Sequence, residues 1–137
     1  MANRLYPTLK EKLLGSGVNF IASTIKAQLV DAGVYTYADA HSFLAAVPAG
    51  ARIGNPITLA NKSITSGIFD AADGTFTSVP AGTGTAATVE ALILYRDTGD
   101  PTTSDLIAYI DVATGLPFTP DGGNANVTWP GGGIFNL

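Results

Sequence analysis

The sequence predicts a mainly β protein, an antiparallel β-sandwich with one or two short helices. Short apolar runs recur about every 8–12 residues, a spacing typical of strands in a sandwich. Glycine, proline, asparagine and aspartate separate these runs and mark the turns. A jelly-roll or immunoglobulin-like arrangement fits this pattern. We therefore expect a single domain over residues 1–137, with extended N- and C-terminal segments.

The first expected element is an N-terminal helix that begins near Pro7. Proline suits the first turn of a helix, apolar residues recur around it at helical spacing, and Gly15 can end the helix. Residues 24–30 then alternate between apolar and polar types. This alternation predicts a strand, and residues 31–33 are expected to turn the chain.

A second short helix is expected over residues 37–47. Asp39 is a candidate N-terminal cap, an apolar stripe follows it, and Pro48 and Gly50 can stop the helix. His41, the only histidine of the chain, lies within this segment beside apolar residues. We expect a capping or packing role for it, since it has no second histidine or cysteine with which to form a zinc site.

Short strands and turns are expected from residue 57 onward. Apolar residues alternate with polar ones over 57–59, a turn follows at 61–63, and further apolar residues lie at 64 and 68–69. The dipeptide Asp73-Gly74 is a common hairpin turn, so it predicts a hairpin that leads to Phe76 and Val79.

The two strongest strand predictions cover residues 88–95 and 106–111. The first is apolar on both faces, which indicates a central strand in a sheet that is covered on both sides. Residues 80–87 precede it as an uncharged, glycine-rich loop. Shorter extended pieces are expected at 126–129 and 134–137.

Composition indicates a subunit that is surrounded by neighbours. Hydrophobic residues make up 46% of the chain and charged residues only 13%. Contacts with other subunits would cover the apolar surface that such a composition leaves. The chain has no cysteine, which excludes disulfides and thiolate chemistry, and no apolar run long enough to span a membrane.

Charge is unevenly distributed along the chain. Residues 1–62 hold six basic and three acidic side chains, whereas residues 63–137 hold one basic and eight acidic ones, which together give the net charge of −4. The acidic total argues against nucleic-acid binding. This charge asymmetry has two interpretations. It is either ordinary variation of the surface, or regions of opposite charge meet between copies in an oligomer.

The triplet Asp97-Thr98-Gly99 matches the catalytic motif of aspartic proteases, in which two carboxylates share one proton. Arg96 precedes it and Asp100 follows it, and both indicate a solvated hairpin loop in which Asp97 stays ionised. Asp97, Asp100 and Asp105 could also offer oxygen ligands to calcium, but their spacing matches no calcium loop. We predict no enzymatic activity, no metal and no cofactor.

Several stretches spread from end to end carry a resemblance to known proteins: MANRLYPTLKEKLL, TIKAQLVDAGVYTYADAHSFLAAVPAGARIG (24–54), ALILYRDTG (91–99), LIAYIDVATGLPFTPDGGNANVTWP (106–130) and IFNL. Through these stretches the chain resembles a family of small tailed-bacteriophage proteins that are usually encoded among virion structural genes. The resemblance carries no catalytic residues, and it implies a component of the virus particle assembled in the host cytoplasm.

Two placements in the particle compete. The first is a capsid decoration, or cement, protein that binds the major capsid protein at the outer shell, often as a dimer or trimer at a symmetry axis. The second is a tail or neck component. The expected interface residues lie near the two ends of the chain and in the acidic hairpin: Arg4, Tyr6, Lys10, Asp97, Asp100, Asp105, Trp129, Ile134, Phe135 and Leu137.

A third hypothesis is a host-surface or glycan-binding module. Carbohydrate recognition needs exposed aromatic rings on which a sugar can stack. The residues that could supply them are Trp129, Tyr35, Tyr37, Tyr95 and Tyr109.

Overall fold

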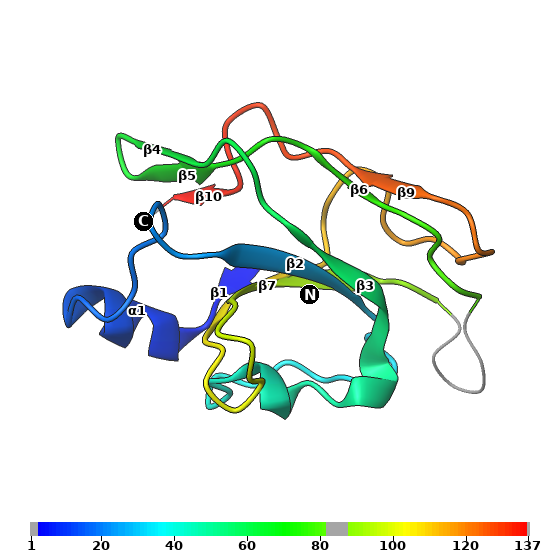
Figure 1. Cartoon of the computed structure of the whole chain (residues 1–137), viewed down its shortest axis with the longest axis horizontal. Coiled ribbons are helices and arrows are strands. Elements are labelled where there is room, and N and C mark those ends of the chain that lie inside the picture. Colours follow the sequence, from blue (N-terminus) through cyan, green and yellow to red (C-terminus); the bar gives the residue numbers. More distant parts are fainter. Residues whose placement is uncertain (1–2, 82–87, 137) are drawn as a thin grey trace.

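The computed structural model of the chain describes residues 3–81 and 88–136, so the core of the predicted loop at 80–87 lies outside the described residues. The fold is mainly β, with antiparallel sheets and one α-helix in the described part of the chain (Figure 1). The helix is α1 (Pro7–Leu14). The strands are β1 (Arg4–Leu5), β2 (Ile25–Val30), β3 (Arg52–Thr58), β4 (Ser63–Thr65), β5 (Ile68–Asp70), β6 (Gly74–Phe76), β7 (Ala91–Arg96), β8 (Leu106–Ile110), β9 (Ala125–Val127) and β10 (Phe135–Asn136).

The strands form one large sheet and two small ones. The large sheet has the order β1-β8-β7-β2-β3, and we call it the central sheet. The small sheets have the orders β10-β5-β4 and β6-β9. Figure 1 shows both small sheets on one side of the central sheet and the segment 31–51 on the other. The central sheet is therefore covered on both faces.

The predicted central strand is confirmed. β7 lies in the middle of the central sheet between β8 and β2, and its first five residues are buried. Leu92 and Leu94 pack in one core cluster, whereas Ala91, Ile93 and Tyr95 pack in the other. Alternate side chains of a strand project to opposite faces, so one strand contributes to both clusters.

The two faces of the central sheet carry different aromatic residues. The face toward segment 31–51 holds all five tyrosines of the chain, and we call it the tyrosine face: Tyr6, Tyr35, Tyr37, Tyr95 and Tyr109. The face toward the small sheets holds five of the six phenylalanines, and we call it the phenylalanine face: Phe20, Phe69, Phe76, Phe118 and Phe135. Trp129 is buried on the phenylalanine face.

A β-bulge helps to build the tyrosine face. Tyr95 pairs with Leu106 and Leu94 with Ala108, so Ile107 is an extra residue on β8. Because of this extra residue, Leu106 and Tyr109 pack in the same cluster although they are three positions apart. Strict alternation would have placed them on opposite faces.

The N-terminal helix is confirmed, but the second predicted helix is wrong. α1 begins at Pro7 and is followed by Gly15, whose N–H donates to the Glu11 carbonyl at 3.0 Å. Residues 37–47 contain only a single 3₁₀ turn, Leu44–Ala46. Their backbone groups bond to a distant segment instead, since the Leu44 N–H donates to the Ser104 carbonyl at 2.9 Å. Pairing with another part of the chain outweighs the local helical pattern.

The predicted hairpin at Asp73-Gly74 is also wrong. β6 begins at the glycine of this dipeptide but pairs with β9, and the tight hairpin of this region connects β4 to β5. The Asp73 carboxylate accepts a hydrogen bond from the Trp129 backbone N–H at 2.8 Å. Gly74 packs closely against Ile57, because an added Cβ would displace the end of the Ile57 side chain. The dipeptide therefore serves long-range contacts rather than a local turn.

Candidate functional site

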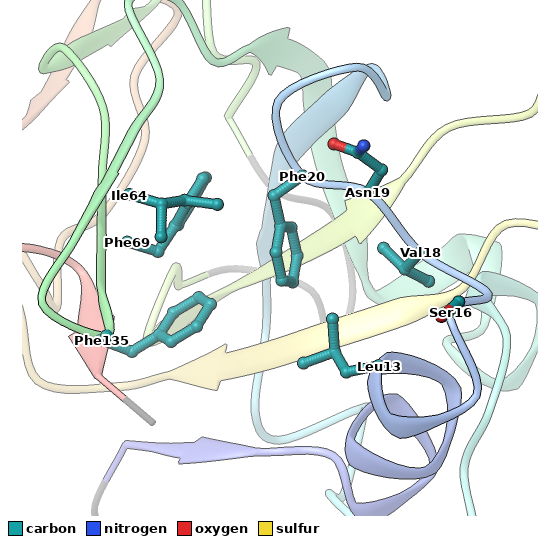
Figure 2. A pocket seen from close by; sticks show the side chains of 9 residues that line it. Leu13, Ser16, Val18, Asn19, Phe20, Ile64, Phe69 and Phe135 are labelled. Atoms are coloured by element: carbon teal, nitrogen blue, oxygen red, sulfur yellow. The ribbon is translucent and has the colours of Figure 1, made fainter.

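Among the described residues, an apolar groove lies at one end of the phenylalanine face. The groove lies between the end of α1 with the loop after it, the β4–β5 hairpin and β10, and its volume is about 420 Å³ (Figure 2). We call it the phenylalanine groove. Its lining residues are Leu13, Ser16, Val18, Asn19, Phe20, Ile64, Gly67, Phe69 and Phe135.

Three phenylalanine rings form one side-chain cluster in this groove. The ring centroid of Phe20 lies 5.1 Å from that of Phe69 and 5.9 Å from that of Phe135, and the Phe69 and Phe135 centroids are 5.3 Å apart. These separations are typical of stabilising aromatic pairs. Figure 2 shows Phe20 between Leu13 on one side and Ile64, Phe69 and Phe135 on the other. The groove therefore has a firmly packed floor.

One wall of the groove is a row of apolar side chains across three strands. Ile64 on β4 is directly opposite Phe69 on β5, and Phe69 is directly opposite Phe135 on β10. Directly paired residues project from the same face of a sheet, so the three side chains stand side by side. Exposure rises along the row, from 2% at Phe69 to 52% at Ile64. The row ends at an unpaired strand edge.

Among the described residues, no charged or titratable side chain lines the phenylalanine groove. Its polar lining residues are Ser16 and Asn19, and the other side chains that line it are apolar. Exposed apolar surface of this kind often marks a contact with another molecule. The groove therefore offers apolar contact area to a partner.

The tyrosine face, by contrast, is closed by hydrogen bonds. The hydroxyl groups of Tyr6 and Tyr35 lie 2.6 Å apart, and the Tyr35 hydroxyl lies 2.9 Å from Nδ1 of His41. The Tyr37 hydroxyl donates to Oδ1 of Asp39 at 2.8 Å. Burial raises the pKa of Tyr6 far above its ordinary value, and burial together with the Asp39 carboxylate raises the pKa of Tyr37 to about 12. The network holds these tyrosines neutral.

A buried carboxylate connects α1 to the central sheet. Asp105 is almost fully buried just before β8, and its Oδ2 accepts a hydrogen bond from Nε of Arg96 at 2.8 Å. Its Oδ1 forms an ion pair with Lys12 of α1. Two cations balance the cost of burying one carboxylate. The group has a structural role in holding the helix against the sheet.

The other two acids of this loop point to different partners. Asp97 forms an ion pair with Lys26 at 2.8 Å, and this bond, with a second one from the Gly99 N–H, lowers the pKa of Asp97. Asp100 accepts a hydrogen bond from the Thr102 N–H within its own loop. The structure therefore does not bring the three carboxylates of the loop together as calcium ligands. Asp97 is paired with a cation, as expected for an ionised loop carboxylate and unlike a protease acid that shares a proton.

Some of the opposite charges of the two parts of the sequence form ion pairs within one chain. The ion pairs Lys12–Asp105 and Lys26–Asp97 each join a base from the first 62 residues to an acid from the remainder. Regions of opposite sign therefore meet within one copy at these two places.

Three of the expected interface residues are buried in the single chain. Tyr6, Asp105 and Trp129 have almost no accessible surface, so they offer a partner little contact area. Trp129 is held by its indole N–H, which donates to the Ala72 carbonyl at 3.1 Å. Leu137 lies outside the described residues.

The remaining expected interface residues keep some accessible surface. Arg4 and Lys10 are exposed, and the Arg4 guanidinium lies 5.1 Å from the Tyr37 ring centroid. Asp100 is exposed and Asp97 is half-buried. Ile134 and Phe135 are half-buried, and Phe135 lines the phenylalanine groove. Of the nine expected interface residues that the structure describes, only Phe135 lines the groove.

Most of the groove is not predicted from the sequence. Leu13 lies in the predicted N-terminal helix, and Ile64 and Phe69 lie in the region where short strands are expected. Val18 and Phe20 fall between the predicted helix and the strand at 24–30, and two apolar residues in so short a connection are a signal that could have found them. The five aromatic residues of the glycan hypothesis are all buried and offer no stacking surface.

Among residues 3–81 and 88–136, no helix is long and apolar enough to cross a membrane. Comparison with protein-family models found no match to the chain, and comparison with curated protein sequences found none either.

Proposed function

We propose that the protein is a structural subunit of a bacteriophage particle that acts by binding its neighbours, and that it is a capsid decoration protein on the outer shell. The resemblance of the sequence suggests the virus particle, and the observation that supports binding to neighbours is the phenylalanine groove, whose apolar row ends at the exposed Ile64. Exposing apolar side chains to water is unfavourable in free energy. A neighbouring subunit that covers them removes this unfavourable exposure.

Two further observations support a binding role. The acids in the loop after β7 and before β8 are engaged with Lys12, Lys26, Arg96 or their own loop, so they maintain the fold. The antiparallel strands and short helical elements agree with the β-sandwich subunit expected from the sequence, and the jelly-roll or immunoglobulin-like form of sandwich is part of this proposal. The partners that we propose are the major capsid protein and other virion proteins.

The number of copies in purified particles tests the placement. Quantitative mass spectrometry of virions should find the protein at a near-stoichiometric ratio to the major capsid protein, and imaged particles should show its density on the outer shell. A handful of copies per particle would contradict decoration and favour the neck or tail. Complete absence from purified particles would overturn the virion assignment itself.

A further inference from the structure

We propose that the protein forms a two-fold symmetric dimer in which β4 of one copy pairs with β4 of a second copy. The pairing joins the two three-stranded sheets into one continuous sheet and covers the open rim of both phenylalanine grooves. The molecule that completes the groove is thus a second copy of this chain. The inference concerns the isolated protein and goes beyond its place in a particle.

β4 is an exposed sheet edge. It is the last strand in the order β10-β5-β4, and all three of its residues, Ser63–Thr65, are exposed. Proteins usually protect such edges by keeping them very short or with prolines, bulges or lysines within the strand. The edge strand β3 contains Pro56 and a register shift against β2. β4 is short, but it contains no proline, bulge or lysine, so its outward backbone groups can pair with another strand.

The turn between β4 and β5 determines which backbone groups point outward. Ser66 and Gly67 connect the two strands with φ values of 53° and 78°, as in a two-residue type I′ hairpin. The residues that flank such a turn, Thr65 and Ile68, form a hydrogen-bonded pair, and the pattern then alternates. The N–H and C=O of Ile64 therefore point away from β5. Across a two-fold axis they bond to the same groups of the second Ile64.

The same pairing brings the apolar side chains together. Directly opposite residues project from one face, so the second Ile64 lies beside the first on the groove side of the sheet. The row Phe135–Phe69–Ile64, which ends in one copy at a half-exposed side chain, continues into the corresponding row of the second copy. Each Ile64 covers the other. The surface is self-complementary, as a two-fold interface requires.

Local charge at this surface permits a second copy. Each chain has a net charge of −4, which opposes association in general, but the residues of β4 carry no charge of their own. Pairing centred on Ile64 sets Ser63 opposite Thr65 and Lys62 opposite Ser66, so like charges do not face each other. The groove adds no charge of its own.

The strand edge alone is too short to hold a dimer. A stable interface buries about 800 Å² on each partner, more than a three-residue strand provides. The apolar lining of the phenylalanine groove, which the second copy would cover, is the source of further contact area. The backbone bonds at Ile64 set the register, and the groove side chains supply the apolar area.

The mass of the full chain in solution tests the dimer. Sedimentation equilibrium over a dilution series up to roughly 100 μM should give a dimer that dissociates on dilution. Ile64→Asp places two carboxylates against each other on the symmetry axis and should raise the dimer Kd at least about tenfold. Amide hydrogen exchange at Ile64 should be slow in the dimer and fast in the dilute monomer.

Val112→Asp is the matched control. Val112 is an aliphatic residue that is 64% exposed and does not line the phenylalanine groove, so its substitution should leave the Kd unchanged. Circular dichroism should show that both variants fold. If Ile64→Asp does not fold, Ile64→Thr replaces it, because threonine keeps the β-branched shape and removes apolar area at the axis.

Three results overturn the inference. One is a native chain that stays monomeric at the highest concentration. Another is a dimer that Ile64→Asp leaves intact, which places the interface elsewhere. The third is an equal loss of dimer in Ile64→Asp and Val112→Asp, which indicates general charge repulsion.

Discussion

The tyrosine face and the phenylalanine face of the central sheet both bury aromatic side chains, but they do so in different ways. A buried hydroxyl needs a hydrogen-bond partner, so the tyrosines are connected to each other, to His41 and to Asp39. A phenyl ring needs no partner and can end at an open surface at the cost of apolar exposure alone. The tyrosine face is therefore completed within the chain, whereas the phenylalanine face leaves a groove for a neighbour.

Strongly alkaline pH should unfold the tyrosine face, because its buried hydroxyl groups ionise there. Burial raises the pKa of both Tyr37 and Tyr95 from 10.0 to about 12, and it also raises the pKa of Tyr6, Tyr35 and Tyr109. A raised folded-state pKa means that this stability is fully present below pH 10 and is lost as the pH rises through 12. Tyrosinate absorbance and circular dichroism should change together in this range. Tyrosinate that forms near pH 10 in a protein with intact circular dichroism would contradict a closed tyrosine face.

Truncation of one aromatic ring on each face should show which face contributes more to the free energy of unfolding. Tyr6→Ala removes a fully buried ring and should lower the free energy of unfolding by about 3–5 kcal/mol. Phe135→Ala removes a half-buried ring at the groove and should cost roughly 1–2 kcal/mol in the monomer, since less of its area leaves water on folding. Urea unfolding measures both. Equal losses would show that the groove is packed as tightly as the tyrosine face.

Exchange of a single hydroxyl should have smaller effects on both faces. Tyr35→Phe leaves the Tyr6 hydroxyl and Nδ1 of His41 without their shared partner, at a cost of about 1–2 kcal/mol. Phe76→Tyr adds a hydroxyl to a ring that is fully buried on the phenylalanine face, at a cost of about 1–3 kcal/mol. Thermal unfolding of the two variants checks the comparison. A neutral Tyr35→Phe would mean that the network adds no stability.

The smallest effect is expected at Asp97, which lies on neither face. Asp97→Asn removes the ion pair with Lys26. Both side chains of this pair are partly exposed to solvent, so the free energy of unfolding should fall by only a few tenths of a kcal/mol. The bond to Lys26 lowers the pKa of Asp97 from 3.8, so its stability is present above pH 3.8 and is lost as the pH falls below it. Native protein and variant should therefore differ in stability at neutral pH and converge in acid. A difference that persists in strong acid would assign another role to Asp97.

Local sequence patterns predicted the elements whose ends are set by nearby residues and the strand whose two faces are both apolar. Pro7 and Gly15 set the ends of α1, and the two-sided apolar run around Leu92 predicted the central strand β7. The two errors, the helix at 37–47 and the hairpin at Asp73-Gly74, both concern segments that bond to residues far away in the sequence. Local propensity is weak beside such contacts and is overridden by them.

In the candidate site, too, residue type predicts one part of the arrangement and tertiary contacts decide the rest. Apolar residues such as Phe20 and Ile64 are indistinguishable from core residues in the sequence, because their type tells only that they avoid water. Tertiary structure decided that Phe69 is buried while Ile64, directly opposite it, remains half exposed at a strand edge. The sequence by itself determined a mainly β chain with a covered central strand, through periodicity and turn residues. Only the pairing of distant strands decided which apolar face was closed by its own chain and which was left open.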